Sequence, residues 1–273
     1  MKMAGLSFDN IPPLSVPLRF FITAPIFGML AGLLIITTQE NWISRWHPAL
    51  LGFTHLLTLG VMAMAMLGAL FQLMPVVSSQ AIPGARHIAP WVHLLLSAGT
   101  LCLVIGFIEG MSRPLMTTAL LLLSGAFLSF LVPLIIGLIR VGRGGDTVYG
   151  IRLAVAALLI ALLLGGLKVL SYVYPVLFAA NPAMLSVSTN VHIGWGFGGW
   201  VVLLVMAVSF QVIPMFHVAP DFHRWITRGL TSALFVGLLL FSTASAESLL
   251  FQIALLTSSG LIIGYSLYTL RLI

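Results

Sequence analysis

Six of the seven histidines in this chain of 273 residues recur in pairs about half a chain apart. The pairs are His55 with His192, His87 with His217, and His93 with His223. Imidazole is a good ligand for iron, copper and zinc, and side chains on facing helices can hold a metal or a haem within a helical bundle. The paired histidines are therefore candidate metal ligands, the pair at 87 and 217 in a supporting role. The seventh, His47, is predicted to be an ordinary polar residue at a membrane surface.

The sequence around these histidines recurs as well. Residues 47–51 (HPALL) are echoed at 181–185 (NPAML), residues 71–75 (FQLMP) at 210–214 (FQVIP), and the pattern H-x-A-P-x-x-H occupies both 87–93 and 217–223. The offsets are 134 (47 to 181), 139 (71 to 210) and 130 (87 to 217) residues, about half the chain. This doubling predicts two structural repeats that position equivalent side chains.

The composition indicates the environment in which the repeats fold. Hydrophobic residues make up 60% of the chain and charged residues only 7%, whereas soluble proteins average about 25% charged residues. Apolar runs of about 20 residues between short polar breaks predict an all-α, polytopic membrane protein. We expect about eight transmembrane helices, over residues 17–38, 49–76, 90–109, 114–140, 150–178, 186–216, 225–244 and 248–270.

Eight spans divide into two repeats of four helices, residues 1–141 and 142–273, joined by the polar segment 142–146. Because each repeat has an even number of spans, both enter the membrane in the same direction. We therefore predict parallel repeats related by a pseudo-twofold axis along the membrane normal.

The net charge of +6 would suggest nucleic acid in a soluble protein, but here the basic residues lie at the ends of predicted spans and orient the chain. The side opposite the termini receives only Arg45 and Arg113 among the arginines. We expect both termini in the cytoplasm, a bacterial-type inner membrane, a retained N-terminal lead-in rather than a signal peptide, and no nucleic-acid partner. The single cysteine, Cys102, excludes an internal disulfide and a cysteine-cluster metal site.

Glutamines follow the first pair of histidines in both repeats. His55 and Gln72 are 17 residues apart, whereas His192 and Gln211 are 19 apart. The glycines between residues 194 and 199 could absorb this difference through a helix bulge, let a flat cofactor approach the backbone, or serve as small-residue helix contacts. These alternatives stay open, as does the role of the two glutamines.

Two basic residues fall near the external face. Lys168 lies inside the fifth predicted span, and Arg45 precedes the second. Lys168 could extend its ammonium group to the membrane surface. Alternatively, both side chains could pair with haem propionates, a functional use of a charge that is costly in a membrane.

The second predicted span resembles a known pattern. Residues 47–75 read His-Pro-Ala-x-Leu-x-x-x-His-Leu-x-x-Leu-Gly, followed by Gly-x-x-x-Gln-x-x-Pro. This resembles helices of the haem–copper oxidase and nitric oxide reductase catalytic-subunit superfamily, including its short NnrS-type membrane relatives. Residues 187–223 resemble it more weakly. The resemblance implies that His55 and His192 are ligands of haem b.

The chain departs from that family in two ways. Gln72 and Gln211 stand where a second histidine is expected, and neither the adjacent His-His pair nor the histidine–tyrosine spacing of a copper centre occurs. We therefore do not expect oxygen reduction at a full binuclear centre.

The leading hypothesis is a membrane protein with one or two haem b groups, with copper as a further candidate metal. His55 and His192 would hold a haem toward the external face, and His93 and His223 a second haem or metal near the cytoplasmic face. The function would be transmembrane electron transfer, with a quinone or cytochrome partner, or binding of a gas such as nitric oxide or oxygen. A small-molecule or metal transporter with repeats and a scaffold subunit of a respiratory complex are the alternatives, and a homo-oligomer fits each of them.

Overall fold

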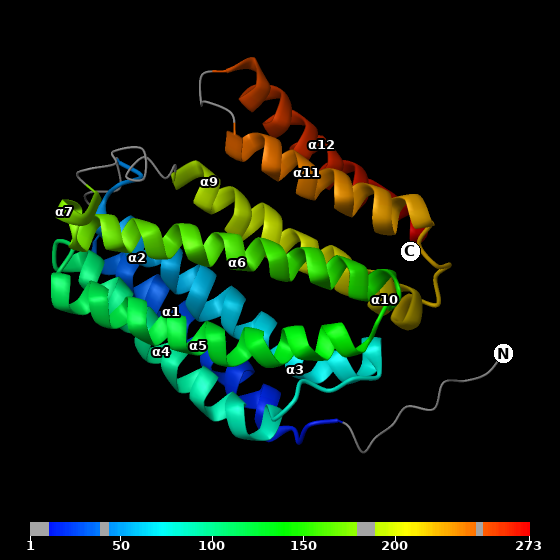
Figure 1. Ribbon diagram of the computed structural model, residues 1–273, viewed down its shortest axis with the longest axis horizontal. Coiled ribbons are helices and arrows are strands. Elements are labelled where there is room, and N and C mark those ends of the chain that lie inside the picture. The colour runs from blue at the N-terminus through cyan, green and yellow to red at the C-terminus, as the bar shows by residue number, and fades with distance from the viewer. Residues whose placement is uncertain (1–10, 39–43, 179–188, 244–247) are drawn as a thin grey trace. The chain divides into compact units, whose positions relative to one another are not determined.

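The computed structural model describes residues 11–38, 44–178, 189–243 and 248–273. Every regular element within these ranges is a helix (Figure 1). Eight helical segments there are long and apolar enough to cross a membrane. The predicted all-α polytopic fold is therefore confirmed.

The spans follow the order predicted from the sequence. They are α1 (Ser15–Thr37), α2–η2–α3 (Pro48–Ser78), α4 (Ala85–Ile108), α5 (Arg113–Arg140), α6 (Asp146–Val173), α9–η3–α10 (Thr189–His217), η4–α11 (Trp225–Thr243) and α12 (Leu249–Leu272), and a short α7 (Pro175–Phe178) follows α6. The labels η2, η3 and η4 denote π-helical segments. The largest differences from prediction are the start of α4, which was expected at residue 90, and the end of α6, which was expected at 178.

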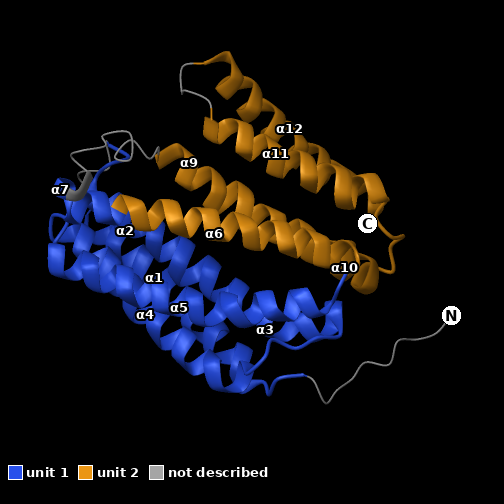
Figure 2. Ribbon diagram, viewed as in Figure 1, with its two compact units in different colours: residues 1–142, 169–179 blue, residues 143–168, 180–273 orange. Residues whose placement is uncertain are grey.

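The chain forms two compact units (Figure 2). The first comprises residues 1–142 and 169–179, and the second comprises residues 143–168 and 180–273. The last turn of α6 belongs to the first unit because Val173 packs into an apolar cluster with Phe107 of α4 and Met116 of α5. The parallel arrangement of two repeats stays a prediction.

In each unit the second span packs closely on the first through small residues. A Cβ atom on Gly60 of η2 would lie 2.4 Å from the Phe27 ring of α1. In the second unit, a Cβ on Gly199 of η3 would lie 2.7 Å from the Cβ of Ala157 of α6. Such distances leave no room for a side chain, so the backbones approach as they do at other small-residue contacts in membranes. This close packing fixes the helices that carry His55 and His192.

The ends of the second spans are also alike. The helix α3 terminates at Ser79, with φ of 56°, and α10 terminates at Val218, with φ of 52°. Both residues lie four positions after the proline of the Gln-x-x-Pro pattern. A positive φ is unusual for any residue other than glycine, and for a β-branched valine it is an outlier. The repeat seen in the sequence thus extends to a shared local backbone conformation.

The two H-x-A-P-x-x-H segments differ, and here the sequence prediction was wrong. Pro90 was expected to begin its helix, but α4 begins at Ala85, after Gly84 with φ of 69°, and Pro90 lies within it. Pro220 lies in a non-helical stretch before η4. Glycine in the left-handed conformation allows a sharp turn into a helix. The helix α4 therefore begins before Pro90 and includes it, without the intrahelical hydrogen bond that a proline cannot donate.

Candidate functional site

His55 is the last residue of α2 and directly precedes the π-helical segment η2 (Leu56–Ala63). Its Nδ1 lies 2.8 Å from the backbone oxygen of Leu51, one turn earlier. A carbonyl oxygen can only accept a hydrogen bond, so Nδ1 carries the proton and donates it. The lone pair of the neutral ring is then on Nε2. The imidazole is half-buried and packs against the Phe107 ring, with 5.1 Å between ring centroids.

His192 has the same protonation pattern in the second unit. It lies in α9 (Thr189–Ile193), just before the π-helical segment η3 (Gly194–Val202). Its Nδ1 lies 3.0 Å from the backbone oxygen of Ala161 in α6, and it must again be the donor. The proton on Nδ1 leaves the ring's lone pair on Nε2, as in His55. The two histidines are therefore alike in the ring nitrogen that carries the proton.

The π-helical segments η2 and η3 follow His55 and His192 at the same place in each unit. A π-helix is rare, occurs mostly as a local widening of an α-helix, and is frequent at functional sites. The sequence left a helix bulge at the glycines between 194 and 199 as one of several alternatives, and the structure places these glycines in η3. The segment η2 was not predicted. Its only sequence signal is Gly60, which meets the Phe27 ring.

His93 makes a different kind of contact. Its Nε2 lies 2.8 Å from the hydroxyl oxygen of Thr23, and that hydroxyl donates its one proton to the backbone oxygen of Arg19 at 2.9 Å. The hydroxyl must therefore accept from His93, so Nε2 is the protonated nitrogen. The ring also meets the edge of Phe20, with 5.5 Å between centroids. His93 thus joins α4 to α1.

The remaining predicted ligands lie near helix ends. His223 is exposed, and its Nδ1 accepts a hydrogen bond from the backbone N–H of Trp225 at 3.4 Å. His87 lies in the first turn of α4 and His217 ends α10, and both are exposed. His93 and His223 belong to different units, so a shared second site for them stays a prediction.

The two predicted propionate partners, Arg45 and Lys168, lie in different settings. The exposed guanidinium of Arg45 lies 4.8 Å from the ring centre of Trp46. Lys168 is half-buried on α6. The prediction that these two side chains bind haem propionates stays untested.

The sequence indicated Arg113 only as a charge on the side opposite the termini. Its Nε donates to the backbone oxygen of Val173 at 2.9 Å, and its guanidinium stacks over Tyr174 at 4.8 Å. It thereby satisfies a free carbonyl at the C-terminal end of α6. The only signal in the sequence was its place at the start of α5, because the partner is 60 residues away.

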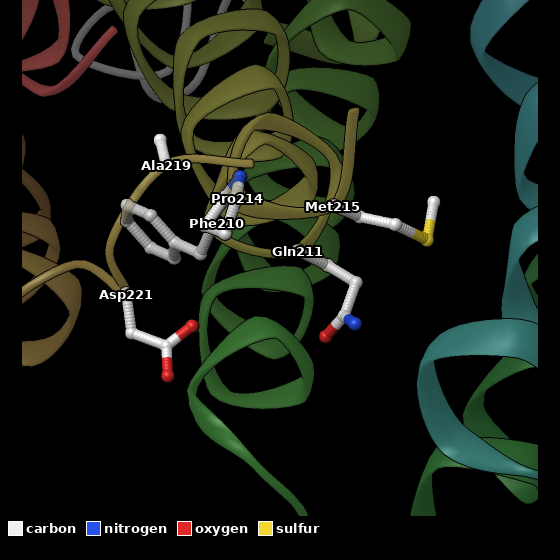
Figure 3. A pocket seen from close by; sticks show the side chains of 6 residues that line it. All are labelled: Phe210, Gln211, Pro214, Met215, Ala219 and Asp221. Atoms are coloured by element: carbon white, nitrogen blue, oxygen red, sulfur yellow. The ribbon is translucent and has the colours of Figure 1, made fainter. Parts of the chain in front are cut away.

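The two glutamines of the repeated pattern have unlike surroundings. The Oε1 of Gln72 is fully buried and has no hydrogen-bond partner among the described residues. Gln211 is exposed on α10 (Figure 3). It borders an open hollow of about 270 Å³, which is lined by Phe210, Gln211, Pro214, Met215, Ala219 and Asp221.

A polar cluster joins α6 to the start of the seventh span. Asp146 forms an ion pair with Arg228, with 2.6 Å between Oδ1 and Nε, and accepts a hydrogen bond from the Thr227 hydroxyl. The Tyr149 hydroxyl meets that of Ser232 at 2.6 Å. The sequence indicated Asp146 only as part of a joint and Arg228 only as an orienting charge.

Within the described ranges, no three or more His, Cys, Asp or Glu side chains lie close enough together to hold one metal ion. The chain matches no protein-family model, no curated protein and no solved structure. The likeness to haem–copper oxidases therefore stays an expectation from the sequence pattern.

Proposed function

We propose that the protein binds haem b within the membrane through His55 and His192 and transfers electrons across the bilayer. The observation that supports this most is the shared state of these two residues. Each donates Nδ1–H to a backbone carbonyl, and each stands at the start of a π-helical segment.

The hydrogen bonds have a chemical consequence. A histidine that ligates a metal almost always donates its other ring N–H to a carbonyl, carboxylate or water, which fixes the tautomer and the ring orientation. His55 and His192 meet this condition at Nδ1, with the lone pair on Nε2. His223 uses Nδ1 as an acceptor and His93 uses Nε2 as a donor, so these two differ.

The donor set fits haem. A porphyrin supplies four nitrogens to its iron, so one or two imidazoles complete the coordination and no larger cluster of protein ligands is required. When bound, the haem supplies a reversible one-electron exchange whose potential depends on its axial ligands and surroundings. The chain's own part is to hold the two rings, with Phe107 packed against the ring of His55.

The distribution of charge supports an orientation for this activity. With the termini in the cytoplasm, His55 and His192 lie toward the external face, where Arg45 and Lys168 also fall. These basic side chains are the proposed partners of the haem propionates. A quinone or a cytochrome is the proposed redox partner.

Optical spectroscopy tests the proposal. The protein is purified in detergent after haem-supplemented expression. Spectra are recorded of the oxidised protein, of the dithionite-reduced protein, and of the dithionite-reduced protein after addition of carbon monoxide. We expect a Soret band, and sharp α and β bands on reduction. All of these bands should be weaker in His55→Ala and in His192→Ala. His217→Ala is the matched control, because that histidine is exposed. A spectrum insensitive to carbon monoxide supports electron transfer, whereas a shift identifies a gas-binding haem.

Transport is the second candidate. Interruptions at corresponding positions of two repeats indicate a substrate site in several transporter folds, and η2 and η3 are such a pair. Two results together would favour a transporter. The folded protein would show no haem spectrum, and substitutions at Gly60 and Gly199 would abolish solute uptake by vesicles that contain it.

A further inference from the structure

The hydrogen bond from His192 reaches an oxygen that is already in use. In an α-helix the carbonyl of residue 161 accepts the N–H of residue 165. The Nδ1–H of His192 is a second donor to this Ala161 oxygen, at 3.0 Å. A carbonyl has two lone pairs, so it can accept both bonds, but the second donor must reach it past the side chain at position 165.

Position 165 has no side chain. A Cβ atom built on Gly165 would lie 2.9 Å from Cε1 of His192, 3.5 Å from its Nδ1 and 3.7 Å from its Nε2. The imidazole therefore occupies the space that any other residue would fill. We propose that Gly165 is the positioning residue of His192: it uncovers the Ala161 carbonyl and thereby fixes the tautomer and orientation of the ring.

Two other close glycines of the second unit, Gly150 and Gly199, serve a different purpose. The missing Cβ atoms of Gly150 and Gly199 face Ala207 and Ala157, at 2.6 and 2.7 Å, so these glycines let two backbones approach. Gly165 instead faces a polar ring that donates a hydrogen bond beside it. The spacing Ala161-x-x-x-Gly165 looks like an ordinary small-residue helix contact, but here it also opens a backbone acceptor.

The first unit does not need such a glycine. The acceptor of His55 is Leu51, and the residue four positions after Leu51 is His55 itself. That hydrogen bond lies within one helix and follows from its own geometry. His192 depends on a second helix, so its ring is the one that a change elsewhere in the chain can release.

Gly165→Ala tests this dependence. The contact is with the end of a side chain that can rotate, so the ring is expected to turn away while the helices stay in place. Nδ1–H then loses its acceptor. Where the proposed haem ligation holds, loss of such a supporting hydrogen bond weakens metal binding by about 10–100-fold. Gly196→Ala is the matched control, because a Cβ there meets nothing within 4 Å.

Two measurements separate the positioning role from the proposed function on which its link to haem rests. The first is nitrogen NMR of the haem-free protein labelled at histidine, with the His192 signal identified by its loss in His192→Gln. We expect the Nδ1–H tautomer of His192 in the parent protein and in Gly196→Ala. We expect this tautomer to be lost in Gly165→Ala. The second is haem affinity in the same variants.

An unchanged tautomer in Gly165→Ala overturns the positioning role, whatever happens to haem affinity. A changed tautomer in a protein that binds no haem supports the positioning role and contradicts the proposed function. A changed tautomer with unchanged haem affinity supports positioning and contradicts His192 as an iron ligand.

Discussion

Gly60 allows a direct test of how η2 is held against α1. A Cβ on this residue would lie 2.4, 2.5 and 2.6 Å from three carbons of Phe27, a side chain that is only 3% exposed. Contacts this short require a buried ring and its helix to shift, and such overpacking costs about 1–3 kcal/mol. Gly60→Ala should therefore lower the free energy of unfolding, although alanine is the better helix former by about 1 kcal/mol.

Gly32→Ala provides the control. A Cβ on Gly32, also in a membrane span, meets nothing within 4 Å. It retains the gain in helix propensity without the clash. We expect the two variants to differ by about 1–3 kcal/mol in the free energy of unfolding, measured by denaturant titration in mixed micelles.

A double-mutant cycle with Phe27→Ala identifies the clash. Phe27→Ala alone should cost about 3–5 kcal/mol, because it empties a buried site. In the double variant the new methyl group enters that space, so the combined cost should fall short of the sum by about 0.5–3 kcal/mol. Equal effects of Gly60→Ala and Gly32→Ala, or strictly additive costs in the cycle, would refute the close approach of η2 to α1.

Two further contacts give predictions of their own. Thr23→Val removes the acceptor of His93 Nε2 and should lower the free energy of unfolding by about 1–3 kcal/mol, since it leaves a donor unpaired in the membrane. The control is Thr37→Val, which should cost less because the exposed Thr37 hydroxyl bonds within its own helix. Equal costs for the two variants would contradict the contact between Thr23 and His93. Asp146→Asn breaks the ion pair with Arg228; the Asp146 and Arg228 side chains are 30% and 39% exposed. The substitution should therefore lower the free energy of unfolding by less than about 1 kcal/mol, and this loss should shrink in high salt. A loss that does not depend on salt would show that solvent does not screen the pair.

The spans could be predicted because apolar length alone defines them. The apolar run over residues 49–76 placed the second span within two residues of its observed limits, Pro48 and Ser78. The start of α4 was misplaced because Pro90 is a helix-start signal only when no better turn precedes it. Gly84 provides that turn, with its positive φ.

The chemistry of the site was harder to predict. The sequence identified His55 and His192 by their repetition, and the acceptor of His55 lies one turn earlier in its own helix. For His192 the acceptor is on another helix, 31 residues away. Likewise, the pairing of Asp146 with Arg228 spans 82 residues. Such contacts arise from packing between helices, for which a single sequence carries no periodic signal.

Ligand replacement with free imidazole tests the central claim most directly. His55→Gly and His192→Gly are reduced with dithionite, and their spectra are compared with the parent before and after addition of imidazole. The account predicts sharp α and β bands in the parent, their loss in each variant, and their return with imidazole, while His217→Gly matches the parent throughout. A folded parent protein without these bands after haem-supplemented expression, or variants that keep the parent spectrum without imidazole, would contradict ligation of haem by His55 and His192.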